Sequence, residues 1–337
     1  MKGLRWIIAL GVVLLLAGGG MFAAGMNMTD WKFDNLDPEI LTAASFTSEH
    51  EIDSVKLSGS WDYEIRYGET FGIEYYESSY ATITVGEQKN GAAGKYMFEF
   101  KESFKISFGI TGIKRKDLKV IVTVAEACDL TVSGSDIDLH AEKGMIFKDI
   151  RVTGSSADVE LENITAQDIY LKGSDLDAAL SEVAAQDITV NGSSSRLELS
   201  GVTARSITAD GSDCSISLQN THIAEKVSLK ASSGKLILKK SSIKDVYIKG
   251  SSVRVAGENA DIRTFEGSGS SVRAELNLVG TTADLKTVSA SGSSARSYVD
   301  GTKGDFHLGN GYKTLSVSGS DACITVKMLG GESIFSE

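Results

Sequence analysis

Hydrophobic and polar residues alternate along most of the chain after residue 49. Ile188 and Val190, for example, flank the polar Thr189. Leu197 and Leu199 repeat the same spacing a few residues later. A period of two places alternate side chains on one face of a β-strand, whereas an amphipathic helix needs a period near 3.6. The pattern therefore predicts strands that bury one face, and their many Val, Ile and Thr residues suit a pleated surface.

A Gly-Ser step separates these strands at a nearly fixed interval. It begins at Gly134, Gly154, Gly173, Gly192, Gly211, Gly250, Gly269, Gly292 and Gly319, and Ala231 fills the one missing place. The intervals are 20, 19, 19, 19, 20, 19, 19, 23 and 27 residues, and such a period is typical of solenoids. We expect an all-β fold, a parallel β-solenoid (β-helix) with coils of about 19 residues. Each coil would contain a strand, a corner where glycine permits positive φ or close backbone approach, a second strand and a wider turn.

The amino terminus differs from the rest. Lys2 and Arg5 precede an uncharged, largely apolar stretch from Trp6 to Met26. A helix of this length spans the hydrocarbon layer of about 30 Å, and basic residues on the leading side favour a cytoplasmic tail with the main body outside. We therefore predict one transmembrane helix, a signal anchor at residues 1–26. A cleaved signal peptide is the alternative, since Ala23 and Ala24 offer small residues near a cleavage site.

The remainder divides into three parts. Residues 27–49 are polar and contain Pro38, the single proline, so we expect a linker. Residues 50–126 alternate less regularly and are enriched in aromatic residues, which predicts an irregular β-rich part at the base of the solenoid. Residues 127–337 carry the regular repeats. Such a base would also cover the open edge of the first coil, where unpaired strands invite aggregation.

Composition and motifs exclude several functions. A net charge of −11 argues against a nucleic-acid partner, which calls for a basic surface. The three cysteines are far apart, so we expect buried thiols rather than a disulfide framework. No HExxH, P-loop or nucleophile-elbow motif is present, and the chain is expected to be no enzyme and to hold no cofactor or metal. The spacing of Asp136 and Asp138 resembles that of aspartates in calcium-binding β-solenoid coils. The glycine-rich nonapeptide repeats of those coils are missing from this sequence.

One outward position changes sign along the repeats. The residue four positions after each corner is Asp138, Asp158, Asp177, Arg196, Ser215, Lys235, Arg254, Arg273 or Arg296. Adjacent coils lie about 4.8 Å apart, so these residues should form one column in which like charges are unfavourable neighbours. Arg254, Arg273 and Arg296 either are neutralised by Glu258 and Glu275 or form a strip that binds an anionic ligand.

The chain resembles the bacterial putative-adhesin family of unknown function with β-strand repeats (DUF4097/DUF2807-like). The resemblance rests on the stretch from Ile52 to Gly59, on Asp62 to Tyr67, on Tyr96 to Phe100, on Leu118 to Val124 and on the repeats that follow. Ala125 stands where members of the family commonly have proline, which is a mild departure. The resemblance implies a surface protein without known catalysis, and it supplies no site residues.

Three functions follow as hypotheses. The first is a binding or scaffold module of the cell envelope, tethered to the cytoplasmic membrane, whose partner is an anionic envelope polymer or another envelope protein. The second is an accessory regulator of an envelope-stress signalling system. The third is a polysaccharide-active β-helix enzyme, which would need acidic residues on adjacent coils to line a groove.

Overall fold

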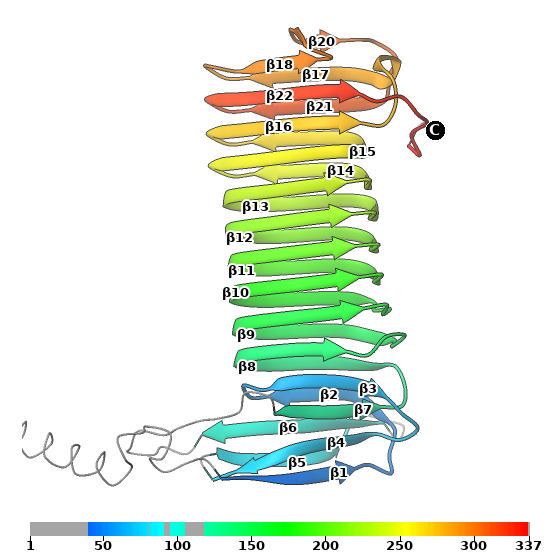
Figure 1. The fold of residues 1–337 in the computed structure, drawn as a ribbon, viewed down its shortest axis with the longest axis vertical. Coiled ribbons are helices and arrows are strands. Elements are labelled where there is room, and N and C mark those ends of the chain that lie inside the picture. The colour runs from blue at the N-terminus through cyan, green and yellow to red at the C-terminus, as the bar shows by residue number, and fades with distance from the viewer. Residues whose placement is uncertain (1–39, 80, 91–94, 105–117, 336–337) are drawn as a thin grey trace, which may run out of the picture.

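The computed structural model describes residues 40–79, 81–90, 95–104 and 118–335, and all of these form one elongated rod (Figure 1). Its regular part consists of parallel strands stacked coil on coil, as the repeat predicts. The strands of this part are β8 (Cys128–Ala141), β9 (Phe147–Glu162), β10 (Asp168–Ser181), β11 (Ala184–Ser200), β12 (Thr203–Gln219), β13 (His222–Lys239), β14 (Ser242–Lys249), β15 (Ser252–Ser268) and β16 (Ser271–Leu278).

Each strand from β8 to β13 includes both predicted strands of a coil and bends at the corner, which is Gly-Ser in β8 to β12 and Ala231-Ser232 in β13. Neighbouring coils pair in register, so that Gly154 lies beside Gly173 and Gly173 lies beside Gly192. Leu197 and Leu199 are at most 2% exposed, whereas Arg196 and Glu198 are exposed. The all-β parallel solenoid and the inward register of its apolar residues are therefore confirmed.

The corner needs glycine because successive backbones approach closely there. A Cβ atom on Gly250 would lie 1.9 Å from the carbonyl oxygen of Ala231 in the coil before it. A Cβ atom on Gly269 would lie 1.6 Å from the carbonyl oxygen of Gly250. Neither glycine has a positive φ. At these corners the lack of a side chain, rather than access to left-handed φ, explains the residue.

The base is built from the first strands of the chain. β2 (Ile52–Ser58) and β3 (Asp62–Tyr67) form a coil that pairs in parallel with β8. β6 (Tyr96–Phe104) and β7 (Lys119–Val124) form the next layer, and β4 (Gly72–Ser78) and β5 (Ala81–Lys89) pair antiparallel with them. Tyr63, Phe71, Phe98 and Phe100 are buried among these strands. The larger aromatic side chains fill a core that is wider than the coils above (Figure 1).

The expected linker at 27–49 is wrong over its last part. Leu41–Thr47 form β1, which pairs antiparallel with β4 at the end of the base. Phe46 packs against Phe98, so this strand buries apolar surface despite its mixed composition. The predicted anchor at residues 1–26 lies outside the described residues. Within the described residues, no helix has the length and apolar character that crossing a membrane requires.

The last two coils are stacked in the opposite order to their sequence. This end contains a short helix, η2 (Thr282–Asp284), and six strands, β17 (Leu285–Ser291), β18 (Arg296–Val299), β19 (Thr302–Lys303), β20 (Phe306–His307), β21 (Lys313–Ser318) and β22 (Asp321–Met328). β21 and β22 pair with β15 and β16 on one side and with β17 and β18 on the other. The C-terminal coil is therefore inserted before the coil that precedes it in sequence, as Figure 1 shows.

Both of these coils bury apolar side chains together with a polar one. The inserted coil points Leu315, Val317, Ala322, Ile324 and Val326 inward, each at most 2% exposed. The outer coil buries the polar Ser297, whose hydroxyl donates to the carbonyl oxygen of Gly304 at 2.6 Å. The inserted coil also buries the charged side chain of Lys313, and the outer coil also buries Leu285 and Val288.

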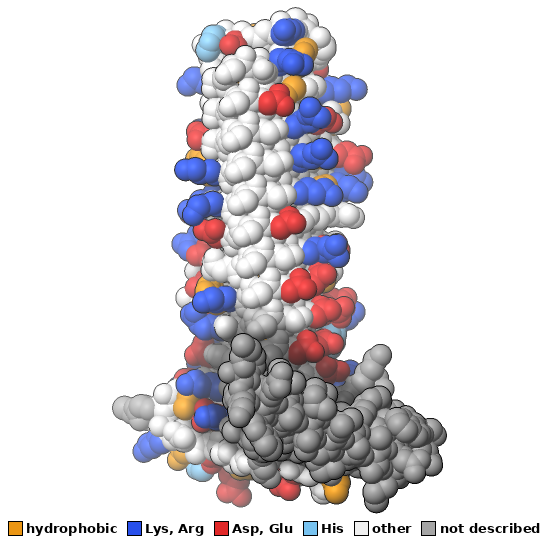
Figure 2. Space-filling view, turned by 90° about the vertical axis from the view of Figure 1, so that its left-hand side faces the viewer, with side chains coloured by type: hydrophobic (Ala, Val, Ile, Leu, Met, Phe, Trp, Pro, Cys, Tyr) orange, Lys and Arg blue, Asp and Glu red, His pale blue; other side chains and the backbone are white. Residues whose placement is uncertain are grey.

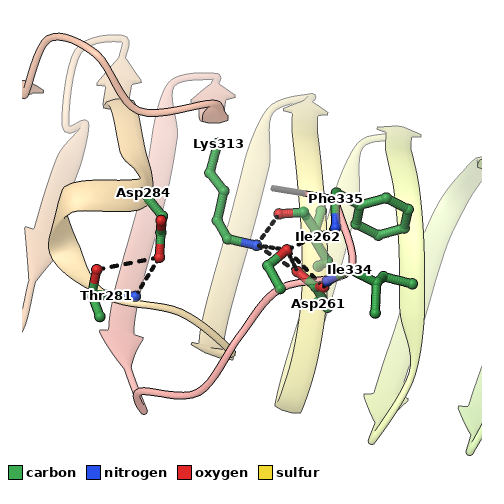
Figure 3. Close-up of polar contacts among 8 residues, drawn as sticks. Asp261, Ile262, Thr281, Asp284, Lys313, Ile334 and Phe335 are labelled. Carbon is green, nitrogen blue, oxygen red and sulfur yellow. Dashed lines mark hydrogen bonds and ion pairs between the residues drawn. The ribbon is translucent and has the colours of Figure 1, made fainter. Parts of the chain in front are cut away.

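A buried ion pair holds the inserted coil in place (Figure 3). The Lys313 ammonium lies 2.5 Å from the Asp261 carboxylate and 3.2 Å from the carbonyl oxygen of Ile262, and the Lys313 side chain is fully buried. Asp261 also accepts hydrogen bonds from the Ser333 hydroxyl and, at 2.8 Å, from the Ile334 backbone N–H. These contacts join β15, β21 and the C-terminal segment.

We predict that Lys313→Met lowers the free energy of unfolding by about 3–5 kcal/mol, because it leaves a buried carboxylate without its counter-ion. Lys313→Met combined with Asp261→Leu should recover most of that loss. Lys327→Met, which removes an exposed lysine from the same coil, should change stability by less than about 0.5 kcal/mol. Urea unfolding measures all three variants, and an equal effect of the two lysine variants would contradict the arrangement.

Candidate functional site

One column of outward side chains runs along the rod, at the position four residues after each corner of the repeats and three residues after Gly59 in the coil of the base. We call it the charged column. Its paired residues, from the base upward, are Asp62, Asp138, Asp158, Asp177, Arg196, Ser215, Lys235, Arg254, Arg273, Cys323 and Arg296. Backbone pairing determines the position of each side chain, because strand residues on one face repeat every second position and coils are spaced by about 4.8 Å.

The lower part of the column is acidic and lines a hollow. Asp62, Asp138, Asp158 and Asp177 all contribute to its wall, together with Trp61, and its volume is about 690 Å³. Partial burial raises the pKa of Asp138 above its usual range, and the negative charges of Asp62 and Glu160 raise it further. Partial burial likewise raises the pKa of Asp158, with Asp138 and Asp177 adding to the shift. The stacked carboxylates therefore disfavour one another's ionised form.

The upper part of the column is basic. Lys235, Arg254, Arg273 and Arg296 are exposed. None of them has a carboxylate oxygen within 4.0 Å among the described residues, so Glu258 and Glu275 do not form ion pairs with these arginines. In contrast, Arg196 at the middle of the column lies 3.4 Å from Asp177. Figure 2 shows that one edge of the rod changes from mainly acidic to mainly basic side chains along its length.

The structure confirms that Arg254 and Arg273 are neighbours, and it separates Arg296 from them. Arg254 pairs with Arg273, but Arg273 pairs with Cys323, and Arg296 lies beyond Cys323. The expectation that Arg273 and Arg296 occupy adjacent coils is wrong, because the C-terminal coil is inserted between them. The column gives two adjacent arginines and a third at twice the coil spacing.

Sequence reasoning missed both Cys323 and Asp62. Cys323 follows Gly319 by four residues, so the corner spacing that located the arginines was sufficient to find it. Asp62 belongs to the coil formed by β2 and β3, whose corner is Gly59-Ser60 and whose spacing is one residue shorter. Its place in the column follows from pairing with Asp138, which no local pattern reveals.

The cysteines provide no reactive thiol in the core. Cys128 and Cys214 are buried, as predicted, whereas Cys323 is only partly buried. Burial raises the pKa of the Cys128 thiol to about 12, and burial also raises the pKa of Cys214. A thiol with a raised pKa is a poor nucleophile and a poor metal ligand. Among the described residues, no group of three or more His, Cys, Asp or Glu side chains could hold a metal ion.

The repeat, the corners and the base together define the class of this protein. The profile of the Toastrack DUF4097 family matches residues 58–252, which is more than half of the chain. The chain belongs to this family, and the resemblance inferred from its sequence is confirmed. The comparison with curated proteins found no match.

Three solved structures are similar over most of their length. One is a putative adhesin from Bacteroides fragilis NCTC 9343, with 11% identity, a TM-score of 0.37 and coverage of 86% of this chain and 97% of that one. Another is a putative lipid binding protein from Parabacteroides distasonis ATCC 8503, with 14% identity, a TM-score of 0.35 and coverage of 85% and 96%. The third is a putative cell adhesion protein from Clostridium sporogenes ATCC 15579, with 9% identity, a TM-score of 0.23 and coverage of 86% and 100%. Scores this low do not establish a shared function.

The acidic half makes the stability of the fold depend on pH. The folded pKa of Asp158 is raised, so its ionised form destabilises the fold above that pKa, and the penalty disappears as the pH falls to the ordinary aspartate range. We predict that Asp158→Asn stabilises the protein at neutral pH and has no effect near pH 3, roughly below the ordinary aspartate pKa.

Asp187 is the matched control, because a hydrogen bond from Arg205 lowers its folded pKa. Asp187→Asn should therefore destabilise the protein at neutral pH, and its effect should fade as the pH falls through the lowered pKa. Thermal unfolding of both variants between pH 3 and 8 measures this. The same sign of effect for the two variants would contradict the electrostatics of the column.

Proposed function

We propose that this chain is a non-catalytic binding module of the cell envelope. In this proposal the rod is held outside the cytoplasm by the apolar segment at residues 1–26, and the basic half of the charged column contacts an anionic polymer or headgroup. The apolar segment with Lys2 and Arg5 before it supports the membrane tether. The family assignment supports a rod without a catalytic centre.

One observation carries the assignment of the contact surface. Arg254 and Arg273 lie on adjacent strands of a rigid sheet, with Lys235 below, and no described carboxylate is within 4.0 Å of any of them. Adjacent like charges repel one another, so the binding of an anion beside these unpaired cations is favourable because it offsets that repulsion. The guanidinium group binds carboxylate and phosphate oxygens with two parallel hydrogen bonds, which favours such anions over others.

The geometry suits an extended ligand. The basic half from Lys235 to Arg296 covers four coil spacings, or about 19 Å. A polymer with repeated negative groups can contact several of these side chains at once, whereas a single small anion reaches only one or two. The regulatory role in envelope-stress signalling has no observation of its own in its favour among the described residues.

The acidic hollow favours a second candidate, a polysaccharide-active enzyme. Asp138 and Asp158 lie on adjacent coils in its wall, and each has the raised pKa that a general acid needs. Partial burial, together with the neighbouring carboxylates, explains these pKa shifts without catalysis, so we rank the enzyme second. Release of reducing sugars from envelope polysaccharides by the full chain, lost in Asp158→Asn, would establish the enzyme and overturn the non-catalytic proposal.

Charge reversal tests the binding surface. Arg254→Glu combined with Arg273→Glu should weaken binding to a phosphate-rich envelope polymer or to anionic vesicles by about a hundredfold or more. This follows from a contribution of about 1.5–3 kcal/mol for each charged contact and about 1.4 kcal/mol for each tenfold change in affinity. Co-sedimentation at low ionic strength, where such contacts are strongest, measures the loss.

The control is Lys226→Glu combined with Lys244→Glu. It makes the same change in net charge at exposed positions in the other strand of the coil. This variant should bind almost as well as the unmodified chain. Unchanged binding by the arginine variant, or an equal loss in both variants, would exclude the basic half as the binding surface.

A further inference from the structure

The charged column is complementary to itself when it is reversed. It contains three consecutive acidic residues, Asp138, Asp158 and Asp177, and three consecutive basic residues, Lys235, Arg254 and Arg273. Arg196 and Ser215 separate the two runs. Both runs have the same spacing, because backbone pairing between coils determines it. A second copy turned end over end therefore presents an acid to each base of these two runs.

We propose that two copies of this chain pair antiparallel along the charged column. The two-fold axis passes between Arg196 and Ser215. Asp177 of each copy then faces Lys235 of the other, Asp158 faces Arg254, and Asp138 faces Arg273. A two-fold interface uses the same surface on both subunits, so one column supplies six such pairs. The surface goes beyond the proposed function because it assigns a role to the acidic half as well.

Within the single chain, Asp138 and Asp158 lie beside other carboxylates, and Lys235, Arg254 and Arg273 lie beside one another. Burial raises the pKa of Asp138 and of Asp158, the charge of Asp138 raises the pKa of Asp158 further, and the facing cations have no described carboxylate within 4.0 Å. Antiparallel pairing places an opposite charge before each of these groups and relieves the repulsion in both runs at once. A parallel pair would instead bring like charges together at every coil, which is unfavourable.

The surface around the basic run allows close approach. The outward residues two positions nearer the corner are the small, exposed Ser233, Ser252 and Ser271. Lys235, Arg254 and Arg273 therefore project beyond their neighbours on this side. The paired runs from Asp138 to Arg273 cover seven coil spacings, or about 34 Å. Charge pairs on an exposed surface set orientation and association rate more than affinity, so the complex should be weak and sensitive to salt.

The orientation has a consequence for the tether. The bases of the two copies lie at opposite ends of the pair. With each base held at a membrane, as proposed above, the pair joins copies on two facing surfaces rather than neighbours on one.

Sedimentation of the full chain in a mild non-ionic detergent tests the association. We expect a dimer at about 0.01 M ionic strength, where the Debye length is about 30 Å, and a monomer at about 1 M, where it is about 3 Å. Arg254→Asp with Arg273→Asp gives an acidic column, and Asp158→Arg with Asp177→Arg gives a basic one. Each variant alone should be monomeric at low salt, and an equimolar mixture of the two should dimerise.

A spin label on Cys323 tests the orientation in the unmodified dimer. Cys128 and Cys214 are buried, so labelling is directed to Cys323. In the antiparallel pair Cys323 lies level with Asp62 of the other copy, nine coil spacings from the second Cys323. The expected distance is therefore about 43 Å along the rod. A much shorter distance would show parallel pairing and overturn the proposal.

Two further results would also overturn it. One is a monomer at every protein concentration and ionic strength, and the other is a dimer that persists in both charge-reversed variants. Circular dichroism and thermal unfolding confirm that the variants fold. A monomer that still binds anionic polymer would refute the pairing alone. Absence of polymer binding by the monomeric variant Asp158→Arg with Asp177→Arg, in which Arg254 and Arg273 are not covered by a second copy, would refute the proposed function alone.

Discussion

Backbone pairing between successive coils is the constraint on which the rest of this structure depends. Every coil places its corner directly on the corner before it, and the contact is so close that a Cβ atom on Gly269 would overlap the carbonyl oxygen of Gly250. Strands held in this way cannot slip by one residue, because a slip would turn the whole apolar face toward water. The narrow core of Val, Ile, Leu and Ala and the near absence of buried aromatic residues above the base follow from the same packing.

The same register aligns the charges. Residues that are about 19 positions apart in sequence become neighbours at the spacing of paired strands. The outward residues of successive repeats change from Asp to Lys and Arg along the chain, so the charge of the column changes from negative to positive within a few coils. The surface is rigid and linear, which suits extended ligands or another rod. The buried pair of Lys313 and Asp261 extends this arrangement by holding the C-terminal coil within the stack, where it places Cys323 between Arg273 and Arg296.

Much of the fold could be predicted because the repeat is local. The spacing of Ile188 and Val190 and the corner at Gly192 were sufficient to predict strands, inward faces and coil contacts. The order of the last coils was not predictable, since it depends on the pairing of β21 with β15, whose residues lie about 50 positions apart in the sequence. β1 was missed because it pairs with β4, whose residues lie about 30 positions away in the sequence. Lys313 shares the inward parity of Leu315 and Val317, a signal that was available, but its partner Asp261 lies 52 residues away.

The stacking order can be measured directly through Cys323. Arg273→Cys places a second thiol on the strand beside Cys323, within the separation that a disulfide requires. Mild oxidation of the full chain should give an intramolecular disulfide between these two positions, identified by peptide mapping and by the loss of two hydrogens from the intact mass. Coils stacked in sequence order would leave Cys323 unpaired with this residue. In that case Arg273→Cys combined with Arg296→Cys would form the disulfide instead, and the account of the rod and of its charged column would be contradicted.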